Sequence, residues 1–164
     1  MKQEKTIYVS TLMFNRAFTR AAFILKNRPA FLAGRLCPVG GRLEAGETPV
    51  QGAAREHSEE TLVATREEDW TPYARLERAD AVMHCFYAVT DDVEQCRTNT
   101  AEKNWETVYV LDVADVLAAS VTPADGESSA FLADDRWVSD DLAALIGLVL
   151  RARRQGGFTV IHAA

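Results

Sequence analysis

The alternation of apolar and polar residues divides the chain into short strand-like runs and a few helical stretches. Runs rich in β-branched and aromatic residues predict strands at 6–14, 19–25, 73–79, 82–90 and 105–112, and a shorter apolar run covers 36–39. Helical periodicity predicts helices at 49–63, at 113–119 and from Ser139 or Asp140 to about Arg154. An acidic stretch with glycine and serine predicts a loop at 123–135. Short strands mixed with helices predict an α/β or α+β domain, with a mixed sheet between helical layers.

Length and charge narrow the class of protein. The chain has 164 residues, which predicts a single domain over 1–164, and its 48% hydrophobic and 26% charged composition is that of a folded protein. Eighteen basic residues stand against 24 acidic ones, a net charge of −6. Because such a surface repels phosphate backbones, we expect no polymeric nucleic acid as partner. Free nucleotides stay open as ligands, since a metal ion can bridge two anions.

Membrane and redox context follow from two further observations. The longest apolar run, Leu142 to Leu150, is far shorter than the roughly 20 residues that span a bilayer, so we expect no membrane association. The run can serve a core or the interface of a homodimer. The three cysteines are odd in number and contain no CxxC pair, which favours a reducing cytoplasm over a disulfide framework.

The helix predicted at 49–63 carries the candidate chemistry. Thr48 can act as its N-cap, with Pro49 at the first helical position and Gln51 completing a capping box. At 100° per residue one face collects three carboxylates, together with a small residue one turn earlier: Gly52, Glu56, Glu59, Glu60 and Val63. A solvated acidic face is the simple interpretation of such a cluster. Carboxylates on one rigid face also suit Mg²⁺ or Mn²⁺, and these cations suit phosphate substrates.

The segment from Gly41 to Val63 reads GRLEAGETPVQGAAREHSEETLV and resembles the Nudix box, G-x5-E-x7-R-E-U-x-E-E-x-G-U with U aliphatic. Seven defined positions match: Gly41, Glu47, Arg55, Glu56, Glu59, Glu60 and Val63. Two positions depart from the pattern. His57 replaces an aliphatic residue, and we expect it to be a core histidine on the apolar face. Leu62 replaces a glycine, so the helix is expected to run on slightly or to end differently.

The resemblance implies roles for these residues. It implies that Glu56, Glu59 and Glu60 coordinate Mg²⁺ or Mn²⁺, with the backbone carbonyl of Gly40 completing the shell. Arg55 and Glu47 would orient these carboxylates. The catalytic set that follows comprises Glu56, Arg55, Glu59 and a distal glutamate.

The distal glutamate and the residues that bind substrate are less well defined. Glu102 and Glu106 flank Trp105 just before a predicted strand, and Glu102 is our choice for the distal catalytic glutamate. Glu44 lies in the same loop as Glu47 and is a weaker candidate. The candidates for contacts with phosphate and base are cations and aromatic residues on loops: Arg28, Arg35 and Arg42, and Phe31, Trp105 and Trp137.

Nudix enzymes hydrolyse a nucleoside diphosphate linked to another group X, with water attacking one phosphorus of the pyrophosphate. The resemblance therefore implies metal-dependent hydrolysis of a small nucleotide substrate. By elimination, we favour a MutT-like nucleoside triphosphate pyrophosphohydrolase, with an oxidised or non-standard purine as a typical substrate. An ADP-ribose or dinucleotide pyrophosphatase is one alternative, and a catalytically silent Nudix-fold binding or regulatory module is another. An acidic interaction domain of unrelated fold would leave the Gly-Gly turn and the motif spacing unexplained.

Overall fold

The computed structural model describes residues 5–119, 137–139 and 141–162, so the loop predicted at 123–135 lies outside the described residues. The strands are β1 (Thr6–Phe14), β2 (Arg20–Leu25), β3 (Arg35–Cys37), β4 (Thr71–Glu77), β5 (Ala81–Val89), β6 (Thr107–Asp112), β7 (Trp137–Val138) and β8 (Thr159–His162). The helices are α1 (Pro49–Thr61), α2 (Val113–Ala119) and α3 (Leu142–Gln155), with short 3-10 turns η1 (Glu67–Asp69) and η2 (Asp91–Gln95).

Within the described residues, the eight strands form one mixed sheet in the order β7-β3-β2-β1-β5-β4-β8, and β6 pairs with β2. The central contact is parallel: β1 pairs with β5 along its whole length, from Thr6↔Ala81 to Phe14↔Val89. The other long ladders, β4 with β5 and β2 with β6, are antiparallel. A mixed sheet of this kind confirms the predicted fold class.

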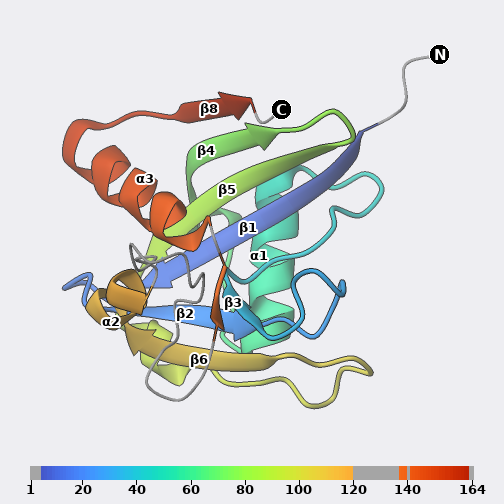
Figure 1. Ribbon diagram of the computed structural model, residues 1–164, viewed down its shortest axis with the longest axis horizontal. Coiled ribbons are helices and arrows are strands. Elements are labelled where there is room, and N and C mark those ends of the chain that lie inside the picture. Colours follow the sequence, from blue (N-terminus) through green and yellow to red (C-terminus); the bar gives the residue numbers. More distant parts are fainter. Residues whose placement is uncertain (1–4, 120–136, 140, 163–164) are drawn as a thin grey trace, which may run out of the picture.

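Helices cover both faces of the sheet, as Figure 1 shows for α1 and α3. Alternate residues of β1 point to opposite faces, because side chains alternate along a strand. Leu12 and Phe14 join the core beneath α2 and α3, whereas Val9 and Met13 join the core beneath α1. No helix in the described ranges is long and apolar enough to cross a membrane.

Several element boundaries differ from the prediction. Strand β4 begins and ends two residues earlier than expected, and its register with β5 shifts between Pro72 and Ala74. Strands β7 and β8 were not predicted, because two and four residues are too few for a periodic pattern. The N-cap of α3 is Asp141, whose side chain makes no capping hydrogen bond, so the expected cap at Ser139 or Asp140 was wrong.

The end of α1 is the most informative difference. The helix stops at Thr61, and Leu62 itself adopts the left-handed conformation, with φ 60° and ψ 14°. Its backbone N–H donates to the Ser58 carbonyl, which closes the helix as a glycine would. The helix therefore ends two residues before the predicted limit at Val63, with a leucine in a strained backbone region.

Candidate active site

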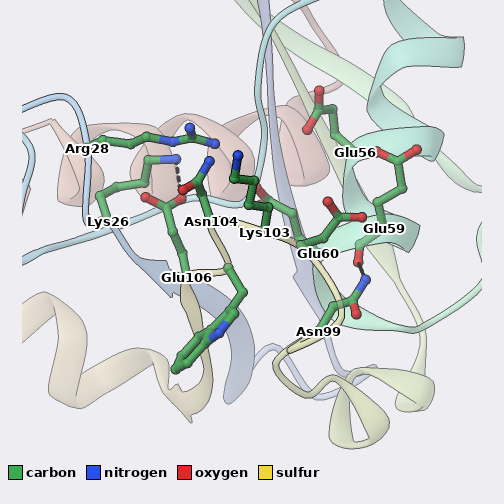
Figure 2. Close-up of a pocket in the computed structure, with 11 residues that line it drawn as sticks. Lys26, Arg28, Glu56, Glu59, Glu60, Asn99, Lys103, Asn104 and Glu106 are labelled. Atoms are coloured by element: carbon green, nitrogen blue, oxygen red, sulfur yellow. Dashed lines mark hydrogen bonds and ion pairs between the residues drawn. The ribbon is translucent and has the colours of Figure 1, made fainter.

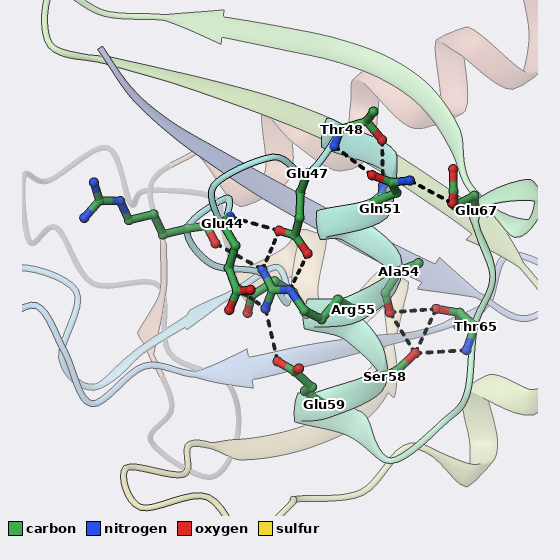
Figure 3. Close-up of polar contacts among 12 residues, drawn as sticks. Glu44, Glu47, Thr48, Gln51, Ala54, Arg55, Ser58, Glu59, Thr65 and Glu67 are labelled. Atoms are coloured by element: carbon green, nitrogen blue, oxygen red, sulfur yellow. Dashed lines mark hydrogen bonds and ion pairs between the residues drawn. The ribbon is translucent and has the colours of Figure 1, made fainter. Parts of the chain in front are cut away.

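Helix α1 begins where the sequence predicts. The Thr48 side chain accepts a hydrogen bond from the Gln51 backbone N–H, and the Gln51 side chain accepts one from the Thr48 N–H (Figure 3). This reciprocal capping satisfies two of the free N–H groups at the helix start. Pro49 follows at the first helical position, where the absence of an N–H is harmless. The start of α1, and with it the direction of each glutamate, is fixed by local sequence.

The inner face of α1 packs on the sheet through Ala53, Ala54 and His57. His57 is fully buried, and its Nδ1 lies 3.0 Å from the Thr11 hydroxyl oxygen. Because that hydroxyl donates to the Val39 carbonyl at 3.0 Å, it accepts from His57, which places the imidazole proton on Nδ1. Burial lowers the His57 pKa to about 3, so the ring is neutral. The prediction of a core histidine is confirmed.

Arg55 ties together the carboxylates of the motif, as Figure 3 shows. Its Nε and Nη2 donate to the two oxygens of Glu47 at 2.7 and 3.0 Å. Its Nη1 donates to Glu56 at 3.0 Å and to Glu59 at 3.1 Å, and Nη2 also reaches the Arg42 carbonyl. The guanidinium holds the pKa of Glu47 below its usual range and is itself kept firmly protonated.

Two half-buried glutamates of α1, Glu56 and Glu60, depend on the Gly-Gly turn. A Cβ at Gly41 would lie 2.5 Å from a Glu56 carboxylate oxygen, and a Cβ at Gly40 would lie 2.2 Å from the Val9 carbonyl. Gly40 also has φ 151°, a region that favours glycine, and its amide hydrogen-bonds the Glu60 carboxylate. The turn can therefore approach the helix and the first strand closely only because it lacks side chains.

Glu60 is the carboxylate whose polar partners are incomplete. Its Oε2 is buried and has no hydrogen-bond partner among the described residues. Burial raises the Glu60 pKa to about 7, against the opposing effect of the nearby Lys26 ammonium. Burial likewise raises the pKa of Glu56. Two acidic groups are thus held in an environment that disfavours their charged forms, and a cation would relieve this.

A cleft of about 210 Å³ opens beside this face of α1 (Figure 2). One wall carries the three glutamates of α1, and cations lie across from them. The lining residues come from α1, from the end of β2 and from the segment before β6: Lys26, Arg28, Glu56, Glu59, Glu60, Asn99, Glu102, Lys103, Asn104, Trp105 and Glu106. The α1 wall is therefore wholly acidic, whereas the opposite wall carries Lys26, Arg28 and Lys103 together with Glu102 and Glu106.

The donor set of the acidic wall fits a hard divalent cation. Carboxylate oxygens are the ligands that Mg²⁺ and Mn²⁺ prefer, and the unpartnered Oε2 of Glu60 offers one such oxygen. Across residues 5–119, 137–139 and 141–162, no three acidic, histidine or cysteine side chains already surround a common point. Glu56 and Glu59 point instead to Arg55. Holding a cation would require these two side chains to turn toward Glu60.

The structure brings together some of the predicted site residues and separates others. Seven line the cleft: Arg28, Glu56, Glu59, Glu60, Glu102, Trp105 and Glu106. Arg55 and Glu47 lie behind them, and Glu44 contributes its backbone N–H to Glu47.

The remaining candidates lie elsewhere. Arg35 lies on β3, and Arg42 meets Arg55 through its carbonyl; neither lines the cleft. Phe31 is 71% exposed outside the cleft, and the side chain of Trp137 is outside the described residues. The three arginines were chosen from sequence without knowing which segments meet the helix, and Arg28 is the one of the three that lines the cleft.

Sequence reasoning missed the amides and lysines of the cleft. Lys26 follows strand β2 directly, and Asn99, Lys103 and Asn104 lie in the segment that leads to β6. Asn99 Nδ2 donates to the Glu59 carbonyl at 2.6 Å and so fastens this segment to the end of α1. A basic residue at the end of a strand that precedes the Gly-Gly turn was the available signal for Lys26.

Comparison with known proteins identifies the family. A family model described as the NUDIX domain matches residues 5–154. A crystal structure of a NUDIX hydrolase from Nitrosomonas europaea superposes with a TM-score of 0.67 at 16% identity, over 99% of this chain and 82% of the other. The NUDIX domain of Shewanella oneidensis NrtR, complexed with ADP ribose, gives 0.67 at 15% identity, over 92% and 90%.

The MutT protein from Bacillus halodurans superposes with a TM-score of 0.63 at 13% identity, over 97% of this chain and 90% of the other. No curated protein gives a significant sequence match. At such identities the structural likenesses show the fold, whereas the family model covers most of the chain, including the glutamates and the arginine of α1. The chain therefore belongs to the Nudix family of hydrolases.

Proposed function

We propose that this protein hydrolyses the pyrophosphate bond of a nucleoside diphosphate linked to another group, in a reaction that requires Mg²⁺ or Mn²⁺. The observation that carries the proposal is the cleft itself: three glutamates of α1 form one wall, one of them being Glu60 with an unpartnered buried carboxylate oxygen, and Lys26, Arg28 and Lys103 lie opposite. Glu56, Glu59 and Glu60 would hold the cation, with the Gly40 carbonyl as a further oxygen ligand. When bound, the cation polarises a phosphoryl oxygen and neutralises the charge that develops there.

The remaining residues prepare the site for a polyanion. Arg55 places one positive charge beside Glu47, Glu56 and Glu59, which reduces the repulsion among these carboxylates and opposes the effect of burial on Glu56. Arg28 lines the opposite wall and is suited to binding a phosphate oxygen. The attacking water would lose its proton to Glu56 or to Glu102, both of which line the cleft.

A nucleoside triphosphate is the substrate that we favour. A cleft of about 210 Å³ is smaller than the roughly 300–1,000 Å³ typical of enclosed ligand pockets. It holds a phosphate chain more readily than two nucleosides. Trp105 is the aromatic residue of the lining and is 47% exposed, so a base can stack on it at the rim. The base could be an oxidised or non-standard purine.

ADP-ribose is the second candidate substrate. The similar NUDIX domain from Shewanella oneidensis NrtR was solved in complex with ADP ribose. A binding module without activity is the less favoured alternative, because this chain keeps all three glutamates and the arginine of α1.

A substrate panel tests the proposal. Purified protein is incubated with nucleoside triphosphates, oxidised purine triphosphates, ADP-ribose and dinucleotides, in Mg²⁺ and in Mn²⁺. Phosphate, pyrophosphate and nucleotide release are read separately. We expect turnover with release of pyrophosphate from a triphosphate, and its loss in excess chelator. Hydrolysis that continues undiminished in chelator would contradict metal dependence, and binding without turnover of any compound would favour the silent module.

A further inference from the structure

Two side chains in the lining of the cleft form an ion pair that the proposed function does not use. Lys26 and Glu106 lie side by side, with Lys26 Nζ 2.6 Å from Glu106 Oε2 (Figure 2). Both side chains are largely buried, with exposed fractions of 16% and 4%. An ion pair in such a place is rarely more stabilising than an apolar pair of the same volume. Stability alone therefore does not explain why this ion pair lies in the cleft lining, and a functional role would explain it.

The sheet itself sets these two residues opposite each other. Leu25 and Thr107 are the last paired residues of the β2–β6 ladder. Lys26 directly follows β2 and Glu106 directly precedes β6, so both lie just beyond the same end of that ladder. Their separation is thus fixed by the backbone, and the ladder aims both side chains at the cleft.

The Glu106 carboxylate is fully engaged. Its Oε2 accepts from Lys26, and its Oε1 accepts from the Asn27 backbone N–H at 2.7 Å. Asn27 Nδ2 also donates to the Trp105 carbonyl at 3.0 Å, which clamps the same two segments together. A carboxylate held at both oxygens is poorly placed to ligate a cation or to take a proton from water. Glu102 lines the same cleft and is exposed.

The Lys26 ammonium, in contrast, keeps donors to spare. An ammonium has three N–H donors. Among the residues that the structure describes, Glu106 is the hydrogen-bond partner of Nζ. Lys26 faces the glutamate wall of α1 across the cleft, where a bound phosphate chain would lie.

We propose that Lys26 binds the phosphate chain of the substrate and that Glu106 is a positioning residue, which acts by holding the Lys26 ammonium in the cleft. This proposal takes its substrate class from the proposed function. It assigns Glu106 a part distinct from that of Glu102, although both are glutamates next to the same tryptophan segment.

A double-mutant cycle on Lys26→Met and Glu106→Gln tests the pair, with KM and kcat for the best substrate of the panel and the Kd of ADP in Mg²⁺ as readouts. We expect Lys26→Met to raise KM and the ADP Kd about tenfold, with a smaller change in kcat. Glu106→Gln should raise them less, and the double variant should resemble Lys26→Met alone, because Glu106 acts through Lys26. Lys26→Arg should restore most of the affinity.

Two matched controls make the same substitutions, Lys to Met and Glu to Gln, at residues outside the cleft. Lys5→Met removes an exposed lysine before β1, and Glu68→Gln neutralises an exposed glutamate that pairs with Arg66. Both should leave KM and Kd unchanged. Circular dichroism and the melting temperature show whether each variant is folded. If Lys26→Met does not fold, the comparison of Lys26→Arg with the parent still tests the role of Lys26.

Mn²⁺ binding without nucleotide separates the roles of the two glutamates. Because Glu106 is not expected to be a ligand, Glu106→Gln should keep the Mn²⁺ Kd within about threefold of the parent value. A Glu106→Gln variant that loses Mn²⁺ binding, or a double variant whose effects add, would overturn the proposal. A parent protein without turnover would instead overturn the proposed function. Unchanged KM and Kd in a folded Lys26→Met variant, with turnover retained, would overturn the roles given to both Lys26 and Glu106 and leave the proposed function standing.

Discussion

His57 and Glu60 lie one helical turn apart on α1, and both carry buried polar atoms, but these atoms differ in their hydrogen-bond partners. The His57 ring has a hydroxyl partner in Thr11, packs against Trp70 with ring centroids 4.9 Å apart, and is held neutral. The Glu60 Oε2 atom has no such partner. Burial disfavours charge at both, but only at His57 does the protein complete the hydrogen bonding of the neutral form.

The contrast separates a structural polar group from a functional one. A buried polar group whose partners are all supplied by the chain stabilises one conformation. A carboxylate that lines a cleft and keeps a buried oxygen without a partner costs folding free energy until a ligand binds it. Changing each residue should therefore move different observables.

The largest effect is expected at Glu60. Glu60→Gln keeps the shape but replaces an anionic oxygen by an amide, a poor ligand for Mg²⁺. We expect kcat to fall by about 100-fold or more, equivalent to about 2.7 kcal/mol of transition-state stabilisation. Steady-state kinetics in saturating Mg²⁺ measure it. Glu68→Gln, on an exposed turn outside the cleft, should change kcat little, and an equal loss there would contradict the assignment of the α1 face.

The same variant should be more stable than the parent when no divalent cation is present. The Glu60 pKa is raised to about 7 in the folded state, so the folded protein loses stability as pH rises from the ordinary carboxyl range through 7. A glutamine has no such penalty. The melting temperature in chelator should therefore be higher for Glu60→Gln than for the parent at pH 8, and the difference should shrink at pH 5.

Arg55 is expected to give the next largest effect. Arg55→Met removes five hydrogen bonds, to Glu47, Glu56, Glu59 and the Arg42 carbonyl, and leaves three carboxylates without a counter-charge. We expect a loss of about 2 kcal/mol of unfolding free energy in chelator, from denaturant titration. Mg²⁺ should recover part of it. The control Arg66→Met removes an exposed arginine and should cost almost nothing.

His57→Leu tests the structural side of the comparison. The variant restores an aliphatic residue on the inner face, so kcat should stay within a few-fold of the parent. At pH 8 the lost contact with Thr11 should cost about 1 kcal/mol. Because the folded-state His57 pKa is lowered to about 3, the parent loses stability as pH falls below the ordinary histidine value, by at most about 1.4 kcal/mol per pH unit.

The leucine variant lacks that loss, so its melting temperature should rise relative to the parent between pH 8 and pH 5. The exposed His162, at the end of β8, supplies the control His162→Leu, which should not reproduce the pH effect. A 100-fold loss of kcat in folded His57→Leu would place the imidazole at the chemistry and contradict the orientation of α1.

The smallest effect is expected at Leu62, where α1 ends. Its left-handed conformation is strained for a residue with a side chain, and the side chain is 46% exposed. Leu62→Gly should stabilise the protein by about 0.5–1 kcal/mol, visible as a rise in melting temperature, with kcat unchanged. A drop in stability would mean that the leucine contacts outweigh the strain.

The sequence predicted the elements that have a local signal. The capping box placed the start of α1, and β-branched runs placed β1 at its observed bounds and β5 one residue late. Where tertiary contacts decide, prediction from sequence was weaker. The end of α1 depends on Leu62 adopting a conformation that its type disfavours, and β8 exists only because β4 offers it an edge.

The site divides in the same way. The resemblance implied that Arg55 and Glu47 orient the carboxylates of α1, and the structure pairs Arg55 with both Glu47 and Glu59. The pairing of Lys26 with Glu106 could not be found from the sequence, because it joins residues 80 positions apart through the β2–β6 ladder. The metal and substrate roles of the glutamates stay predictions.

The parallel pairing of β1 with β5 constrains the order in which the molecule can fold. Every residue of β1 is paired with one 75 positions later, and the Gly-Gly turn and all of α1 lie within the loop that this pairing closes. Closing a loop of that length costs conformational entropy before the contacts between β1 and β5 can form and offset it, and this slows folding. A nascent chain that has reached residue 80 already holds every glutamate of α1 but lacks the strand that anchors β1 beneath them. We therefore expect folding to wait for Val89 to emerge, and the isolated motif peptide to remain unstructured.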